Sequence, residues 1–254
     1  INIAQALSSA AGQDCHRKAD QPADIGFPRD SGPHDAFRTE WWYYTGNLET
    51  ENGRRFGFQL TFFRQALACG PVPKGSRWRT RQIYFAHLGL TDVAGNRFYS
   101  AQRMNRHSLG IAGAAATPFR VWVDDWSAAQ TGQALQLSAR DRSVTLGLTL
   151  TAQTPPLLQG DQGLSRKGPA PGNASYYYSI PRLRVTGQIT IGGRVFKVSG
   201  KAWFDHEWST SALGADVAGW DWFAVHLDDG RNLMVCRIRD REGRLAEASA
   251  ALLD

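Results

Sequence analysis

The chain has 254 residues, of which 42% are hydrophobic, and a formal net charge of +6, so it can build one large or two small domains around a core. No apolar run approaches the roughly 20 residues that a membrane-spanning helix needs. The basic residues are scattered apart from Lys74, Arg77, Arg79 and Arg81, whereas nucleic-acid-binding proteins carry a continuous basic stripe or a known fold signature. We therefore expect no nucleic-acid partner, and interpret the cluster as a solvated loop or as a contact with anionic surfaces.

Residues 1–36 are weakly patterned and are typical of an N-terminal arm, in which residues 1–11 could form a short helix. The chain begins at Ile1 rather than Met, which is consistent with removal of an export signal. The three cysteines lack the spacing of metal ligands. If the protein is exported, Cys15 and Cys69 are the natural disulfide pair, whereas Cys236 lies in an apolar strand and is expected to be a buried thiol.

From Phe37 onward apolar and polar residues alternate with period two, which is typical of half-buried strands. The clearest alternation covers residues 56–62, 144–151 and 183–191. Glycine and arginine recur together at the ends of these runs, at positions 53–54, 95–97, 193–194, 230–231 and 243–244. Because glycine supplies the positive φ of tight hairpin turns, the pattern predicts an all-β fold of antiparallel hairpins.

One hairpin pattern occurs twice, because Trp41 to Leu48 and Trp220 to Leu227 have the same spacing. The two copies either begin two related units or resemble each other only as amphipathic hairpins do. The first unit, residues 37–212, has the length of a closed sheet of about eight strands. The second, residues 213–254, is too short to close, so we expect that it continues in the natural chain or pairs with the first unit.

The first stretch that could carry chemistry starts at Glu40. It continues with Trp41, Trp42, Tyr43 and Tyr44. On a strand, successive side chains point to opposite faces, so bulky aromatic groups lie on both faces here and could line an apolar cavity. A carboxylate among indoles can have a raised pKa and act as a general acid. Alternatively, Glu40 pairs with an arginine such as Arg38 or Arg64 and the aromatic residues are core.

The second stretch is Asp205-His206-Glu207, between Trp203 and Trp208. A regular strand turns His206 inward, whereas a bulge at Gly200 turns Asp205 and Glu207 inward instead. Two carboxylates on one strand face lie about 6.5 Å apart and can divide acid and base roles, or they are solvated charges at a barrel rim. In a closed meander the first and last strands are neighbours, so residues 40–43 and 205–208 are expected to pair side by side.

A metal site is not expected. Adjacent strand residues diverge, so at most two of Asp205, His206 and Glu207 could ligate together, with another histidine needed to complete the site. We predict no metal and no cofactor. The candidate ligand-lining residues share an aromatic or imidazole ring on a strand, although each also fits a buried core position. They are Trp41, Trp42, Tyr43, His87, Tyr176, Tyr178, Trp203 and Trp208.

Several runs together resemble the AttH and carotenoid 1,2-hydratase (hydroxyneurosporene synthase, CrtC) group. They cover residues 27–46, 60–64, 176–179, 202–209 and 219–230, and Asp205-His206-Glu207-Trp208 looks closer to the AttH-like branch. The resemblance implies a lipocalin-like β-barrel followed by the beginning of a second such barrel, in a longer parent chain. It also implies an exported, periplasmic or membrane-associated bacterial protein. Ser31 stands where many relatives have a histidine.

Three functions fit these features. The first is the binding or carrying of a hydrophobic, isoprenoid- or lipid-like ligand. The second is a cofactor-free hydratase for a terminal double bond of an acyclic carotenoid, with Asp205 or Glu40 as acid, His206 or Glu207 as base, and aromatic rings stabilising the cation. The third is an envelope protein that acts with a lipoprotein-release-type transporter, with peripheral membrane contact. The residues leave open whether any reaction is catalysed.

Overall fold

The structure is a computed structural model that describes residues 15–70, 75–211 and 217–253. Three sequence predictions lie outside these residues: the helix at 1–11, the position of Lys74, and the boundary between the two units at 212–213. Within the described part of the chain, no helix is long and apolar enough to cross a membrane.

The described chain is built almost wholly from strands. The elements are η1 (Arg29–Ser31), β1 (Thr39–Glu49), β2 (Arg55–Ala66), β3 (Gln82–Asp92), β4 (Arg97–Arg106), β5 (Ala112–Ala116), β6 (Phe119–Val123), β7 (Trp126–Thr131), β8 (Ala134–Arg140), β9 (Val144–Ala152), β10 (Leu157–Leu158), β11 (Leu164–Arg166), β12 (Ala174–Ile191), β13 (Arg194–Ser209), β14 (Val217–His226), β15 (Asn232–Asp240) and β16 (Leu245–Leu253). The predicted all-β class is confirmed.

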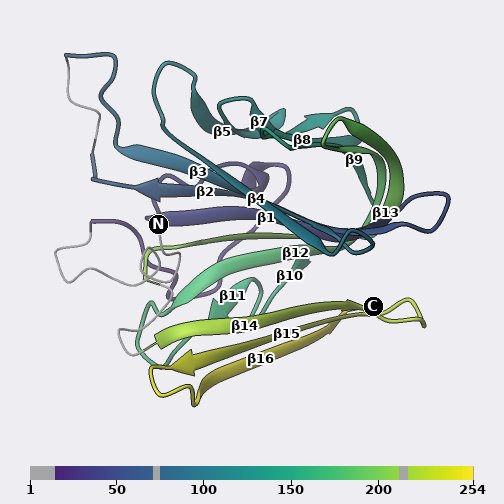
Figure 1. The fold of residues 1–254 in the computed structure, drawn as a ribbon. Coiled ribbons are helices and arrows are strands. Elements are labelled where there is room, and N and C mark those ends of the chain that lie inside the picture. The colour runs from purple at the N-terminus through teal and green to yellow at the C-terminus, as the bar shows by residue number, and fades with distance from the viewer. Residues whose placement is uncertain (1–14, 71–74, 212–216, 254) are drawn as a thin grey trace.

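The larger sheet runs in the order β4-β3-β2-β1-β13-β12-β9-β8-β7-β6-β5, and β10 and β11 pair with β12 beside this path. The sheet curls until β5 and β6 pack against β3 and β4, which makes a nearly closed antiparallel barrel (Figure 1). Eleven described strands form its wall, rather than about eight. The additional strands include β5, β6 and β7, whose five or six residues are too short to give a clear period-two signal.

Alternating side chains fill the barrel interior. In β9, Val144, Leu146, Leu148 and Leu150 are buried while the residues between them are partly exposed, as the sequence pattern predicts. Large rings from opposite parts of the wall complete the core, including Trp42, Tyr44 and Trp126. Most of the barrel interior is therefore filled by its own side chains, and a hollow of about 190 Å³ remains beside Tyr44, Leu150 and Phe204.

Most predicted turn glycines adopt left-handed backbone conformations. Gly53, Gly193, Gly230 and Gly243 have φ between 78° and 94°, a region that costs little only without a Cβ. At the β3–β4 turn the left-handed residue is Asn96, with φ 48°, rather than the glycine before it. Asparagine tolerates this region better than most residues.

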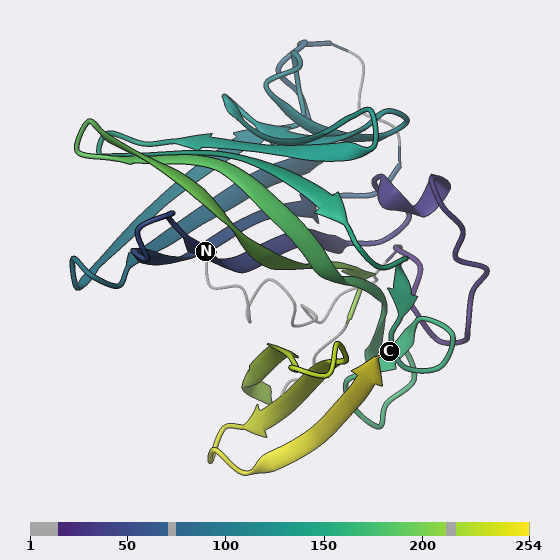
Figure 2. The same ribbon diagram turned by 90° about the vertical axis from the view of Figure 1, so that its right-hand side faces the viewer.

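The second unit is a separate three-stranded sheet in the order β14-β15-β16. It lies face to face with the outer wall of the barrel (Figure 2), and its described strands share no backbone ladder with the barrel. Tyr177 and Trp203 of the barrel form one apolar cluster with Met234, Cys236 and Ile238 of β15. The three-stranded sheet thus contacts the barrel through side chains. Its described strands do not pair with those of the barrel, which was one of the two alternatives for the second unit.

The N-terminal arm is fastened to the barrel by a disulfide between Cys15 and Cys69, with the Cα atoms 6.2 Å apart. This pairing confirms the bridge expected for an exported protein. Cys69 lies just after β2, and the Arg17 amide donates a hydrogen bond to the Ala36 carbonyl further along the arm. The arm is thereby held close to the start of β1, where it contributes side chains to the barrel interior.

Removing the disulfide is expected to destabilise the fold. The bridge closes a loop of 54 residues, and the loss of this constraint on the unfolded chain corresponds to about 4 kcal/mol. Urea unfolding of the Cys15→Ser/Cys69→Ser double variant should show this lower free energy of unfolding. Added reductant should shift the wild type and leave the double variant unchanged; equal stability of the two proteins would contradict the prediction.

Candidate functional site

The first and last barrel strands pair side by side. The antiparallel register places Glu40 opposite Trp208, Trp42 opposite His206 and Tyr43 opposite Asp205, which confirms the predicted neighbourhood of the two motifs. The ladder continues without a shift past Gly200, so the bulge considered there is absent. His206 consequently faces the barrel interior, and its two acidic neighbours in the sequence face the outer wall.

Glu40 organises a buried polar cluster on the interior face. Its Oε1 accepts hydrogen bonds from His34 Nδ1 at 2.7 Å and His206 Nε2 at 2.8 Å. Its Oε2 accepts one from Arg64 Nε at 2.8 Å. The other nitrogen of the His34 ring lies 3.1 Å from Asp30 Oδ1. With two carboxylates on its two nitrogens, His34 is placed to be an imidazolium, which donates at both.

The electrostatics of the cluster follow from these contacts. Burial alone would raise the pKa of Glu40. The charges of Arg64 and His34 and the hydrogen bonds from His206 and His34 hold it well below its usual range. Burial alone would lower the pKa of His34, but Glu40 and Asp30 raise it above its usual value. Burial lowers the pKa of His206 to about 4, so this ring is neutral near pH 7. Of the two alternatives for Glu40, the ion pair with Arg64 is the one present, and a raised pKa is not.

The cluster also bears on metal binding, because donor atoms of His34, Glu40 and His206 all lie within 4.8 Å of one another. The distances from the two ring nitrogens to Glu40 Oε1 are 2.7 and 2.8 Å, which are those of hydrogen bonds. Two ligand atoms of one tetrahedral ion, each about 2.0–2.2 Å from it, would lie roughly 3.3 Å apart. An ion here would have to replace the protons that the histidines share with Glu40, beside the guanidinium of Arg64. We therefore describe the cluster as a charge-balanced hydrogen-bond network.

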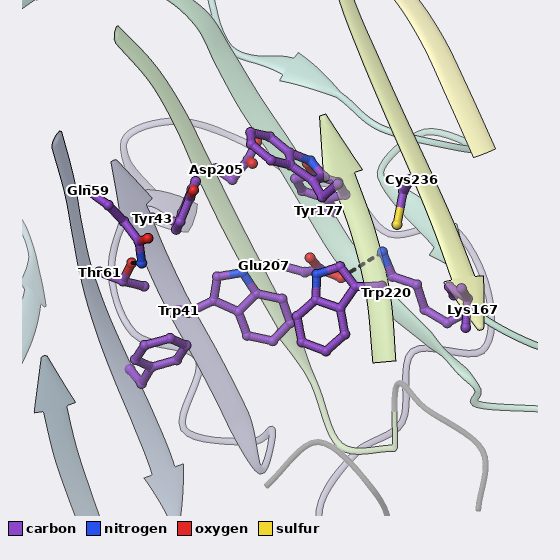
Figure 3. A pocket seen from close by; sticks show the side chains of 13 residues that line it. Trp41, Tyr43, Gln59, Thr61, Lys167, Tyr177, Asp205, Glu207, Trp220 and Cys236 are labelled. Atoms are coloured by element: carbon purple, nitrogen blue, oxygen red, sulfur yellow. Dashed lines mark hydrogen bonds and ion pairs between the residues drawn. The ribbon is translucent and has the colours of Figure 1, made fainter. Parts of the chain in front are cut away.

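A pocket lies on the opposite face of the same strands, between the barrel wall and the three-stranded sheet, and we call it the outer pocket (Figure 3). Its volume is about 260 Å³. The residues that line it are Trp41, Tyr43, Gln59, Thr61, Phe63, Lys167, Tyr177, Asp205, Glu207, Trp220, Trp222, Cys236 and Ile238. Aromatic rings make up much of this wall, and the few charged groups come from β13 and from the residue after β11.

Asp205 is the buried acid of the outer pocket. Its Oδ1 accepts hydrogen bonds from Ser179 Oγ at 2.6 Å and from Trp203 Nε1 at 2.7 Å. Burial raises the pKa of Asp205 to about 7, against the opposing effect of these donors. Because Oδ1 accepts two hydrogen bonds, the proton of the neutral form belongs on Oδ2. Asp205 can therefore exchange a proton near neutral pH, as a general acid must.

Glu207 is held by a separate set of partners. Lys167 Nζ lies 2.9 Å from Glu207 Oε1, as the dashed line in Figure 3 shows, and Ser175 donates a hydrogen bond to the same oxygen. The Lys167 ammonium also lies 5.1 Å from the centre of the Tyr177 ring. Two acidic side chains of β13 thus enter one pocket in different environments: Asp205 accepts hydrogen bonds from neutral donors, and Glu207 is ion-paired with Lys167.

The remaining predicted residues divide between the two faces. Tyr178 and Tyr176 belong to the interior core, and the Tyr178 hydroxyl lies 3.3 Å from His206 Nδ1. Trp42 and Trp208 are interior as well, and their rings stack on His206 and His34 respectively. These positions do not reach the outer pocket. In particular, His206 cannot serve as the base for an acid at position 205, because the two side chains leave opposite faces of β13.

Two predicted ligand residues lie beside the outer pocket rather than in it. Trp203 supports Asp205 through its indole N–H and stacks on His226. His87 is the strand partner of Thr61, but lines a separate shallow hollow on β3 and β4. The sequence predicted that Trp41 and Tyr43 share one strand face and that Asp205 and Glu207 share another, without relating the two faces. The unshifted pairing of β1 with β13 turns all four side chains into the outer pocket.

Sequence reasoning missed the contributions of Lys167, Tyr177, Trp220 and Trp222. Tyr177 could have been found from its register, since it lies opposite Glu207 in the β12–β13 pair. Trp220 and Trp222 were noticed only as part of a repeated hairpin. Lys167 follows the three-residue strand β11, and no sequence pattern connects it with Glu207.

Comparisons with known proteins agree with this architecture. A family model described as AttH-like matches residues 18–254. A crystal structure assigned to AttH from Nitrosomonas europaea has 38% sequence identity and a TM-score of 0.82, covering 94% of this chain and 72% of that one. Kievitone hydratase from Nectria haematococca has 14% identity and a TM-score of 0.66, covering 94% and 68%, a likeness in fold alone. No functionally curated sequence matches the chain.

Replacing Glu40 tests the interior cluster. Glu40→Gln leaves the buried Arg64 and His34 without their carboxylate, and removing one partner of a buried ion pair costs about 3–5 kcal/mol. Urea unfolding should show a loss of that size. Glu242→Gln, in an exposed pair with Arg244, is the matched control and should change stability by less than about 0.5 kcal/mol. Equal effects of the two substitutions would refute the role given to Glu40.

The raised pKa of Asp205 predicts a pH dependence of stability. Between about pH 4 and pH 7 the folded protein keeps a proton on Asp205 that the unfolded chain releases, so this group lowers the free energy of unfolding as pH rises through that window. In Asp205→Asn residue 205 cannot titrate, so the variant does not lose this part of its free energy of unfolding as pH rises. Unfolding in urea should therefore show the variant gaining stability relative to the wild type between pH 5 and pH 8, whereas a constant difference would contradict the assignment.

Proposed function

The chain belongs to the AttH-like family, and we propose that it binds an apolar, unsaturated ligand in the outer pocket. The observation that carries the proposal is a cavity with a largely aromatic wall, into which the buried carboxyl of Asp205 points and where burial raises its pKa. Ligand sites are typically mostly apolar with a few placed polar groups. The barrel interior offers less space, because its own side chains fill most of it and its remaining hollow measures about 190 Å³.

The size of the outer pocket limits the ligand. Its volume of about 260 Å³ is slightly below the range of roughly 300–1,000 Å³ for drug-sized ligands. The pocket therefore suits a molecule of one or two isoprene units, or the end of a longer isoprenoid or lipid chain. Trp41, Trp220 and Trp222 would cover its apolar surface, and Asp205 would meet its reactive or polar end.

Hydration of a carbon–carbon double bond is the second candidate function, favoured by the pKa of Asp205. Asp205 would donate its proton to the less substituted alkene carbon, where the π electrons form the new C–H bond and leave a tertiary cation. Water would add to that cation, and its extra proton would return to Asp205 directly or through Glu207. The rings of Trp41, Tyr43 and Trp222 would stabilise the cation. The fold shared with kievitone hydratase supports this hypothesis by analogy.

Location outside the cytoplasm is part of the same proposal. The disulfide between Cys15 and Cys69 supports it, because such bonds persist mainly in oxidising compartments.

Ligand binding can be tested with geraniol, an unsaturated alcohol of two isoprene units, by isothermal titration calorimetry. Trp222→Ala removes one aromatic wall of the outer pocket and should weaken binding at least tenfold. Trp122→Ala, a substitution on β6 outside the outer pocket, should bind as the wild type does. Absence of binding to the wild type, or equal weakening in both variants, would contradict this location for the ligand.

Hydration can be tested with neurosporene, by following hydroxylated product with mass spectrometry. Asp205→Asn should reduce turnover by at least a hundredfold, since general acid catalysis contributes about 10²–10⁴-fold. Asp221→Asn, which changes a carboxylate paired with Arg239 outside the outer pocket, should keep wild-type turnover. No product from the wild type, or full activity in Asp205→Asn, would exclude Asp205 as the acid for this substrate.

A further inference from the structure

Two loops meet at one end of the barrel, where the described parts of the connection between β2 and β3, residues 67–70 and 75–81, project beyond the wall (Figure 1). Ser108 Oγ, after β4, donates a hydrogen bond to the Arg77 carbonyl at 2.6 Å. Arg106 Nη1 donates one to the Trp78 carbonyl at 3.1 Å. These bonds join the two loops, and we call their described residues, 67–70, 75–81 and 107–111, together with Arg106, the tip.

The tip carries three large apolar side chains that are exposed to solvent. Leu67 is 56% exposed, Trp78 is 55% exposed and Leu109 is 43% exposed. Leu67 belongs to the same end because its amide donates to the Arg81 carbonyl at 2.7 Å. Single exposed apolar residues are ordinary on protein surfaces, but three on adjoining loops, one of them tryptophan, indicate a contact surface.

Arginines surround these apolar groups. Arg77, Arg79 and Arg81 lie on the first loop, and Arg106 ends β4 directly before the second. Neither loop sequence, 67–81 or 107–111, contains an acidic residue. The guanidinium of Arg106 lies over the Trp78 ring, 5.8 Å from its centre. Guanidinium groups recognise phosphate oxygens in a bidentate manner, and tryptophan is favoured where an apolar region meets a wet, polar one.

We propose that the tip docks on an anionic phospholipid surface. Trp78, Leu67 and Leu109 enter the boundary between headgroups and acyl chains, and the arginines contact lipid phosphates. A small projecting tip suits a bilayer interface, which needs only an apolar anchor and nearby positive charge. A specific protein partner would need a much broader complementary surface, of roughly 1,000 Å² or more in total.

This docking would bring the outer pocket close to a source of apolar molecules. Phe63 of β2 lines the outer pocket, and Leu67 lies four residues further along the chain, which is about 13 Å in an extended strand. The docking surface does not depend on the function proposed for that pocket. It is argued only from the exposed apolar side chains and the arginines of the tip.

Vesicle flotation tests the proposal with the intact chain. Vesicles of phosphatidylcholine with 30% phosphatidylglycerol should bind the wild type at low salt, and pure phosphatidylcholine vesicles should bind much less. Arg77→Gln/Arg79→Gln should weaken partitioning roughly 25-fold, about fivefold for each arginine near an anionic surface. The matched control, Arg97→Gln/Arg184→Gln, makes the same change in net charge at exposed positions elsewhere and should reduce binding less than threefold.

A second pair of variants separates the apolar anchor from charge. Trp78→Ala should weaken binding, while Phe98→Ala, at the far end of β4 and 68% exposed, should not. Unchanged urea midpoints would establish that each variant is folded. The proposal is overturned if wild type does not float with anionic vesicles, or if the tip variants bind like their controls. Equal loss in both arginine pairs would indicate attraction by net charge alone and would also overturn it.

Discussion

The buried carboxylate of Glu40 is the interaction on which the rest of the structure depends. Through one oxygen it holds His34 of the arm and His206 of β13, and through the other it holds Arg64 of β2. Arg64 in turn donates to the carbonyls of His34 and Phe37. An isolated charge at this depth would be very costly, so the arm and three strand segments must assemble together to compensate it.

The cluster around Glu40 also determines which side chains point outward from the barrel wall at β13. Because neighbouring strand residues point to opposite faces, fixing His206 toward Glu40 also fixes Asp205 and Glu207 toward the three-stranded sheet. A shift of one residue in register would exchange the two sets and bury both carboxylates in the apolar barrel core. The polar cluster therefore stabilises the fold and also sets the geometry of the outer pocket.

Much of the fold could be predicted from period-two patterns and turn glycines. Residues 144–151 alternate clearly enough to assign their faces, and the pairing of residues 40–43 with 205–208 followed from closing a meander. The orientation at Asp205 could not be decided, because a glycine such as Gly200 marks either a bulge or a close approach of strands. Here it marks a close approach: a Cβ at Gly200 would lie 2.0 Å from the Asn47 carbonyl oxygen.

The site was less predictable because its residues come from distant segments. Lys167 and Trp222 reach the outer pocket only through tertiary packing, which local patterns do not encode. The most direct test of the account is the ionisation of Asp205, followed by carbon-13 NMR of its carboxyl group during a pH titration. A midpoint near pH 7 is predicted for an acid buried in an aromatic pocket. A midpoint near pH 4, the value of a solvated aspartate, would contradict it.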